Sequence, residues 1–260
     1  NNNKIKSNIY TTSFVEGNWS KRKKNIYNAN FFNTGNISFS DQEGSFFTIC
    51  NDDMLECKIV YLEKNKTDVF KDIKELSSKY YFNTQGSFFQ DNEQKMLYFV
   101  SDRKGGFGGL DIWVSIIDNN GNFGVPINAG NNINSSNDEI TPFYNKHDGM
   151  MYFSSNKKNG LGGFDIYKSE GKLNFWKEAK NVKELNTKKD EMYLTFYNER
   201  KGYLSSNRNS LNCKNEENCC NDIFSFEYKK DISDTIKLPP KPYEYLPLSL
   251  YFHNDEPDCC

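Results

Sequence analysis

Leu97-Tyr-Phe-Val-Ser-Asp-Arg-Lys-Gly-Gly-Phe-Gly-Gly-Leu-Asp-Ile-Trp113 is followed by a near copy, Met151-Tyr-Phe-Ser-Ser-Asn-Lys-Lys-Asn-Gly-Leu-Gly-Gly-Phe-Asp-Ile-Tyr167. The two copies start 54 positions apart (151 − 97). Self-similarity at a long, fixed period indicates one supersecondary unit that is used several times. Each copy contains an apolar run, a glycine-rich turn and a second apolar run, which is the pattern of an antiparallel hairpin.

Two weaker copies extend the repeat in both directions. Ser45-Phe-Phe-Thr-Ile-Cys-Asn51 and Gly202-Tyr-Leu-Ser-Ser-Asn-Arg208 align with the first strand, so its copies start at 45, 97, 151 and 202. The last strand of the unit contains an isoleucine that occurs five times, whereas the strand before it occurs only four times. The five isoleucines are Ile9, Ile59, Ile112, Ile166 and Ile223. We therefore expect residues 8–14 to form a closing strand whose partner strands lie upstream or elsewhere in the fold.

Strand–turn–strand units of about 50 residues, with no helical pattern between them, are typical of propeller blades. Aromatic residues make up 15% of the chain, which suits twisted, half-buried strands. We therefore predict an all-β fold: a β-propeller with four recognisable blades plus a closing strand, and five or more blades in total. Trp19, Trp113 and Trp176 are expected to pack in the core or between blades.

The glycine-rich turn of each unit is followed by an aspartate. Asp111, Asp165 and Asp222 stand in the pattern Asp-Ile-aromatic, where a carboxylate can accept the N–H groups of the turn. A phosphate-binding loop would need a helix N-terminus after its glycines, and here a strand follows. We therefore assign a structural role in the turn to Gly105, Gly106, Gly108, Gly109, Asp111, Gly160, Gly162, Gly163, Asp165 and Asp222.

Paired carboxylates precede the first strand of two units. In a propeller this strand lines the central channel, so Asp138, Glu139, Asp190 and Glu191 are candidate channel carboxylates. Two carboxylates from different blades can supply acid–base chemistry or bind a cation. The other interpretation is structural, because an acidic residue at a strand entry can accept the N–H groups of its own turn. The repetition favours the structural interpretation, since a catalytic residue is rarely needed once per blade.

The cysteines fit an oxidising compartment. Cys50 and Cys57 flank a predicted hairpin turn, where a cross-strand disulfide is feasible. Cys213, Cys219 and Cys220 cluster in the long turn of the last unit, in the spacing Cys-x5-Cys-Cys with no histidine nearby. Disulfides, free thiols and a metal site all remain open, and the candidates for disulfides are Cys50, Cys57, Cys213 and Cys219.

Composition and motifs argue against several functions. The 33 basic and 35 acidic residues give a net charge of −2, which offers no electrostatic reason to bind nucleic acid. No apolar run approaches the ~20 residues that span a bilayer. His147 and His253 stand apart from any nucleophile motif, and the sequence contains no Walker loop, Gly-x-Ser-x-Gly elbow or His-Glu-x-x-His. We therefore expect no cofactor, no metal and no catalytic site, so that the protein would not be an enzyme.

Tyr152-Phe-Ser-Ser-Asn-Lys157 and Gly160-x-Gly-Gly-x-Asp-Ile-Tyr167 resemble the WD40-like blade of TolB-type propellers, in the version found in large cell-envelope proteins of Bacteroidota. The resemblance covers most of residues 1–228. It implies the propeller fold and says little about function.

A second resemblance concerns the end of the chain. Leu246-Pro-Leu-Ser-Leu-Tyr-Phe-His-Asn-Asp-Glu-Pro-Asp258 looks like the opening strand of the OmpA-like, peptidoglycan-binding module that follows the propeller in those proteins, although His253 stands where an Asp is usual. The implied domains are a propeller (1–228), a Pro-rich linker (229–245) and a truncated OmpA-like module (246–260). Thr235 lies in an Asp-Thr-apolar sequence similar to the O-glycosylation signal of Bacteroidota.

Two functions are consistent with these features. The first is a non-catalytic periplasmic scaffold, associated with the outer membrane or cell wall, whose partners are other envelope proteins and, through the downstream module, peptidoglycan. The resemblance adds a place in type IX secretion or gliding machinery. The alternative is a propeller that binds or hydrolyses a glycan or peptide, with the channel carboxylates beside Tyr144, Tyr193 or Tyr197.

Overall fold

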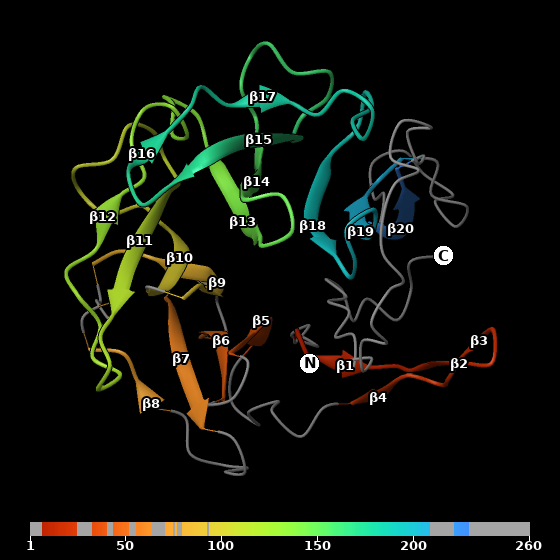
Figure 1. The fold of residues 1–260 in the computed structure, drawn as a ribbon, viewed down its shortest axis with the longest axis horizontal. Helices are drawn as coiled ribbons and strands as arrows, with labels where there is room; N and C mark the ends of the chain where they lie inside the picture. The colour runs from red at the N-terminus through yellow and green to blue at the C-terminus, as the bar shows by residue number, and fades with distance from the viewer. Residues whose placement is uncertain are drawn as a thin grey trace, which may run out of the picture.

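The computed structural model describes residues 7–24, 33–40, 44–51, 56–63, 71–74, 76, 80–92, 94–208 and 221–228. These residues form an all-β fold in which blades are arranged around a central axis (Figure 1). The predicted β-propeller is therefore confirmed. Among the described residues, no helix is long and apolar enough to cross a membrane.

Four antiparallel sheets form the blades, which we number I to IV. The inner strand of each blade is followed outward by the next strands in chain order. Blade I contains β5 (Asn33–Ser40), β6 (Gly44–Cys50), β7 (Cys57–Glu63) and β8 (Lys71–Asp72). Blade II contains β9 (Asn83–Gln90), β10 (Lys95–Ser101), β11 (Asp111–Ile117) and β12 (Ile127–Asn128).

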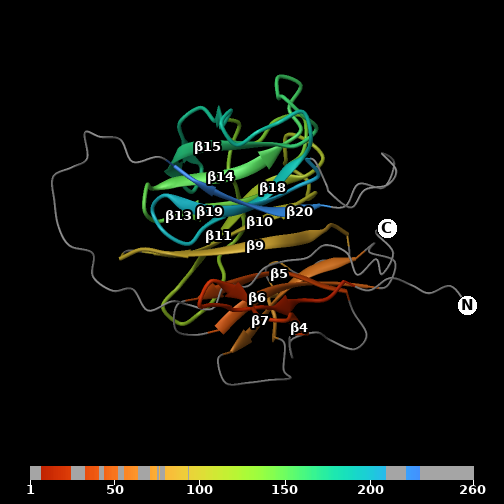
Figure 2. The ribbon, with the colours of Figure 1, turned by 90° about the vertical axis from the view of Figure 1, so that its right-hand side faces the viewer.

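Blade III contains β13 (Glu139–Asn145), β14 (Met150–Ser155) and β15 (Asp165–Lys172), and β15 pairs with both β16 (Phe175–Trp176) and β17 (Lys180–Asn181). Blade IV contains β18 (Glu191–Phe196), β19 (Lys201–Ser206) and β20 (Asp222–Glu227). Seen from the side, the inner strands run through the thickness of the disc (Figure 2).

The N-terminal residues lie on the arc between blade IV and blade I (Figure 1). They form two small sheets, in which β1 (Tyr10–Thr11) pairs with β4 (Lys23–Lys24) and β2 (Phe14–Val15) pairs with β3 (Asn18–Trp19). Glu16 and Gly17 both have positive φ, at 50° and 82°, as a two-residue hairpin turn of the primed type requires. β1, which lies within the predicted closing strand of residues 8–14, therefore pairs with β4. The further partner strands that we expected on its inner side are still a prediction.

The core lies between adjacent blades and is built on the second strand of each. Phe46 of blade I stacks on Phe88 of blade II, with ring centroids 5.5 Å apart. Trp113 and Trp176 are 7% and 6% exposed, which agrees with the predicted packing role. Trp19 is 45% exposed and so lies outside the core, although its ring packs edge-on against Tyr203 of blade IV, 6.5 Å away.

Each inner strand contains a β-bulge, where one or two residues have no direct partner on the second strand. One residue of each bulge has a left-handed backbone: Asn36 (φ 47°), Gln85 (52°), Thr141 (53°) and Tyr193 (53°). Positive φ is rare for residues with a side chain, most of all for β-branched and bulky ones. The left-handed conformation recurs once in each blade, on four different residue types, so it is the fold that imposes it. The bulge changes the direction of one side chain in each inner strand.

Candidate functional site

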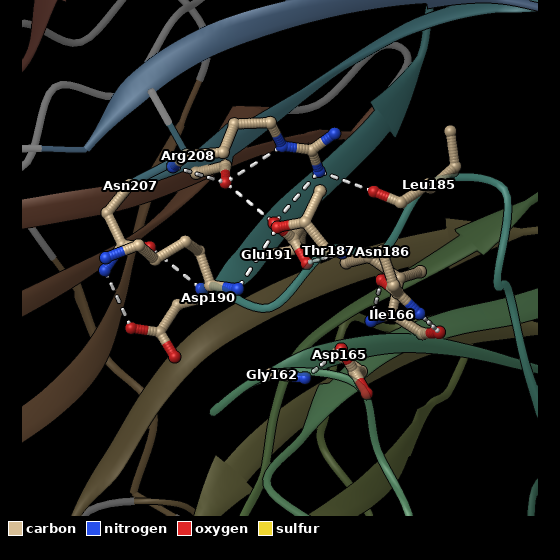
Figure 3. Close-up of polar contacts among 12 residues, drawn as sticks. Gly162, Asp165, Ile166, Leu185, Asn186, Thr187, Asp190, Glu191, Asn207 and Arg208 are labelled. Carbon is tan, nitrogen blue, oxygen red and sulfur yellow. Dashed lines mark hydrogen bonds and ion pairs between the residues drawn. The ribbon is translucent and has the colours of Figure 1, made fainter. Parts of the chain in front are cut away.

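The blade-entry glutamates are buried and bonded to their own turns. Glu191 accepts hydrogen bonds from Thr187 N (2.8 Å), Thr187 Oγ1 (2.7 Å) and Ser206 Oγ (2.8 Å) (Figure 3). Its Oε1 also lies 3.0 Å from Arg208 Nη2. Each carboxylate oxygen therefore has protein partners, as the structural interpretation required.

Glu139 repeats this arrangement in blade III. It accepts from Ser135 N (2.6 Å), Ser135 Oγ (2.7 Å) and Ser155 Oγ (2.7 Å), and its side chain is fully buried. The nearby Lys157 donates instead to the Ile133 carbonyl at 3.2 Å, and burial lowers the pKa of its amine. The two glutamates thus fix the entry turns of their own blades.

The aspartates beside them hold the glycine-rich loop of the preceding blade. Asp138 accepts from Leu110 N (2.9 Å) and Asn156 Nδ2 (3.1 Å). Asp190 accepts from Phe164 N (2.8 Å) and from Asn207 Nδ2 (2.9 Å), as Figure 3 shows for Asn207. Each aspartate thereby ties one blade to the next. A catalytic or cation-binding use of the four predicted carboxylates is therefore not supported by their geometry.

The glycine-rich loops pack too closely to carry side chains. Asp111 accepts from Phe107 N at 2.7 Å, and Asp165 accepts from Leu161 N and from Gly162 N (3.2 Å). A Cβ on Gly162 would lie 1.8 Å from the Lys189 carbonyl oxygen. The same obstacle recurs at Gly106, Gly108, Gly109, Gly160 and Gly163, where a Cβ would come within 1.8–2.5 Å of another atom. Gly105 has φ +92°, and Asp222 begins β20 after a loop that lies outside the described residues.

Sequence reasoning missed one repeated structural residue. Asn134 accepts from Ile112 N (2.8 Å) and donates to Ile112 O (2.8 Å), so its amide extends the strand like a backbone group. Asn186 does the same with Ile166, at 2.7 and 2.9 Å. The signal was present, because Asn-Ser/Thr-x-x-Asp-Glu occurs at 134–139 and again at 186–191.

The polar groups that do meet near the axis come from the four bulges. Gln85 Oε1 accepts from Thr141 N at 2.7 Å, and Gln85 Nε2 donates to Tyr193 Oη at 3.4 Å. The Tyr193 hydroxyl also hydrogen-bonds with Asn36. Residues of all four blades are therefore joined in one network, which we call the axial network: Asn36, Gln85, Thr141 and Tyr193. Of its members, only Tyr193 was singled out from the sequence.

The axial network is electrically neutral. Burial raises the pKa of Tyr193, so its phenol stays protonated at physiological pH. Asn, Gln and Thr carry no charge and offer both donors and acceptors. The network therefore suits a neutral, hydroxyl-rich ligand better than an ion, and it does not contain the paired carboxylates that acid–base catalysis needs.

The structure joins Cys50 of β6 and Cys57 of β7 by a disulfide, at the hairpin position predicted from the sequence (S–S 2.00 Å). Cys213, Cys219, Cys220 and Thr235 lie outside the described residues, as do residues 229–260. Within the described part of the chain, no group of three or more His, Cys, Asp or Glu side chains could hold a metal ion.

No protein-family model matches the sequence, and no curated protein matches it. Solved structures do match the fold. A thermostable family-43 glycoside hydrolase superposes with a TM-score of 0.62 at 15% identity, over 95% of this chain and 90% of that one. The GH43 endo-arabinanase of Bacillus licheniformis gives 0.55 at 10% identity (90% and 97%), and the endo-arabinase of Bacteroides thetaiotaomicron gives 0.52 at 12% (88% and 96%).

These neighbours correct two expectations. We expected a non-catalytic scaffold and not an enzyme, partly because a repeat built for packing accounted for the prominent residues. These three structures with the same fold are glycoside hydrolases, so the propeller architecture gives no ground for excluding an enzyme. At this level of identity the likeness establishes the fold, and the activity of this chain has to be argued from its own residues.

Proposed function

We propose that this protein is a glycan-acting propeller that binds a neutral glycan at its axis. The observation that carries the proposal is the axial network, in which the neutral side chains of Asn36, Gln85 and Tyr193 meet the backbone N–H of Thr141, so that every blade contributes one residue. Sugar hydroxyl groups both donate and accept hydrogen bonds, as do the amide, hydroxyl and phenol groups of this network. Ligand sites on protein scaffolds commonly combine a few such convergent polar groups with aromatic surroundings.

Hydrolysis is the activity to assay, because the solved structures that share this fold are named as glycoside hydrolases and arabinanases. Glycosidic cleavage generally uses two carboxyl groups, about 5–5.5 Å apart for retention or 6.5–9.5 Å for inversion. Glu139 and Glu191 are bonded to their own turns and fit neither role. Binding and cleavage therefore need separate measurements.

We also propose a location in the periplasm, associated with the outer membrane or cell wall, with peptidoglycan and other envelope proteins as neighbours. The support is the resemblance of residues 97–113 and 138–167 to TolB-type envelope propellers, and of residues 246–258 to the start of an OmpA-like module. A glycan-acting propeller held near the cell wall would meet polysaccharides there. Fractionation of the native host, with immunoblots of the periplasmic and outer-membrane fractions, tests the location.

The binding test uses calorimetry with arabinan, xylan and soluble peptidoglycan fragments, together with an assay for released reducing ends. Tyr193→Phe removes one hydroxyl group and keeps the ring. Loss of one hydrogen bond predicts an affinity about two- to tenfold lower. Tyr197→Phe, at an exposed position after β18, is the matched control and should bind as the parent does. Absence of glycan binding by the parent, or equal affinity of Tyr193→Phe, would contradict the proposal.

A further inference from the structure

The N-terminal strands repeat the outer half of a blade. In blade I, Val60 and Tyr61 of β7 pair with Asp72 and Lys71 of β8. Blade II pairs Trp113 and Val114 with β12 in the same way, and blade III pairs Tyr167 and Lys168 with β17. At the N-terminus, Tyr10 and Thr11 of β1 pair with Lys24 and Lys23 of β4. β1 and β4 therefore correspond to the third and fourth strands of a blade.

The hairpin between them repeats the interblade packing of blade III. Trp176 follows the β15–β16 turn and packs edge-on against Tyr98 of the preceding blade (6.0 Å between ring centroids, interplanar angle 64°). Trp19 follows the β2–β3 turn and packs edge-on against Tyr203 of blade IV (6.5 Å, 68°). Tyr98 and Tyr203 both lie on the second strand of their blade. The N-terminal hairpin thus contacts blade IV as the outer part of a next blade would.

The two tryptophans differ in what covers them. Trp176 is 6% exposed because the inner strands of its own blade cover it: Tyr144 of β13 lies 6.1 Å from it, and Met151 of β14 belongs to the same core cluster. Trp19 is 45% exposed and its partner Phe14 is 59% exposed. Tyr197, 5.4 Å from Tyr203, is 46% exposed. We call Trp19 and the three rings around it the aromatic strip, in which Tyr203 is half-buried and the others are exposed: Phe14, Trp19, Tyr197 and Tyr203.

We propose that the aromatic strip is the docking surface for an antiparallel β-hairpin that supplies the first and second strands of a fifth blade. Blade III defines the chemistry of this partner. Its first strand carries an aromatic ring at the position of Tyr144, which stacks on Tyr98 (6.1 Å, 7°) and contacts Trp176. Its second strand carries an unbranched apolar side chain at the position of Met151. The docked ring would lie between Tyr203 and Trp19 and bury both.

The test uses a peptide of residues 138–156, which contains β13 and β14, added to the full-length chain. Trp113 and Trp176 are buried, so Trp19 is the tryptophan whose emission should respond. We expect a saturable blue shift of the emission, and about tenfold weaker binding of the peptide that carries Tyr144→Ala. By calorimetry, Trp19→Ala protein should bind the parent peptide about tenfold more weakly. Phe175→Ala, at a ring that is 78% exposed on blade III, should not alter binding.

A linked variant avoids the entropic cost of ordering a free peptide. Residues 138–164 inserted before Asn8 of the full-length chain place the copied hairpin ahead of β1, as in blade III. We expect Tm to rise by about 5 °C or more and Trp19 to become less accessible to acrylamide. The proposal is overturned if the linked hairpin changes neither property. It is also overturned if Trp19 responds to a glycan and not to the hairpin, or if Trp19→Ala only abolishes a dimer of the parent chain.

Discussion

Replacing Glu191 distinguishes a structural carboxylate from a catalytic one. In the variant Glu191→Ala, Thr187 N, Thr187 Oγ1 and Ser206 Oγ lose their acceptor. Arg208 loses an ion pair of 3.0 Å with a fully buried partner. Removing one member of a buried ion pair costs about 3–5 kcal/mol, because the other charge and donors remain buried without a partner.

The lower end of that range applies here, since the Arg208 side chain is 22% exposed and can recover part of its hydration. We therefore expect a loss of about 3 kcal/mol. For a domain of this size, 1 kcal/mol shifts Tm by roughly 2–4 °C, so the expected decrease is about 6–12 °C. The measurements are urea unfolding and differential scanning calorimetry at pH 7.

Two companions sharpen the comparison. Glu191→Gln keeps one carbonyl acceptor and should lose less stability than Glu191→Ala. Glu199→Ala, in an exposed turn after β18, should change Tm by no more than about 2 °C. If Glu191→Ala kept the parent Tm while losing a measured glycosidase activity, the structural assignment of this carboxylate would be wrong.

Three further variants or conditions test other parts of the fold. Gly162→Ala puts a Cβ 1.8 Å from the Lys189 carbonyl oxygen and should lower the free energy of unfolding, measured in urea, by about 3 kcal/mol or more. The control is Gly121→Ala, where φ is +81° but no atom lies within 4 Å of the added Cβ; it should lose about 1 kcal/mol. Reduction of the Cys50–Cys57 disulfide, which closes a short loop, should lower the free energy of unfolding by about 2 kcal/mol in parent protein and leave a Cys50→Ser, Cys57→Ser variant unchanged. Burial raises the pKa of Tyr228 to about 12 from 10.0, so between these pH values the folded state keeps a proton that the unfolded state releases. The free energy of unfolding should therefore fall as pH rises from 10 to 12. Thermal melts over this pH range should show a smaller fall for Tyr228→Phe. A stability that rises over this range would contradict the assignment.

The blades could be predicted from the sequence because each repeated residue has the same structural role in every blade where it occurs. Glu139 and Glu191 each fix an entry turn, and Gly108 and Gly162 each allow close backbone approach. A residue that solves the same local problem in every blade recurs at the repeat period. For the same reason, the repetition favoured a structural role for the blade-entry carboxylates before their contacts were known.

The axial network could not be predicted in this way. Gln85, Thr141 and Tyr193 occupy the same left-handed position of their strands, yet they differ in size and chemistry. Gln85 and Tyr193 contact each other across blades, whereas the Thr141 hydroxyl bonds to Ser154 of its own blade, so local strand patterns give no rule for the residue at this position. Trp19 illustrates the same limit, because its turn resembles that of Trp176 and only the neighbouring strands decide its exposure.

Differences between the repeats therefore mark where this chain departs from a uniform propeller. Blade II has Asn83 where blades III and IV have Glu139 and Glu191 at the start of the inner strand. Arg103 donates to Asn83 and lies over Phe99 and Trp113. Burial lowers its pKa, although the charge of nearby Asp102 acts in the opposite direction. The axial positions also differ from blade to blade, and their polar groups bond across blades. The repeated carboxylates are bonded to turns and loops of the fold, so the axial network is the place to test for glycan binding.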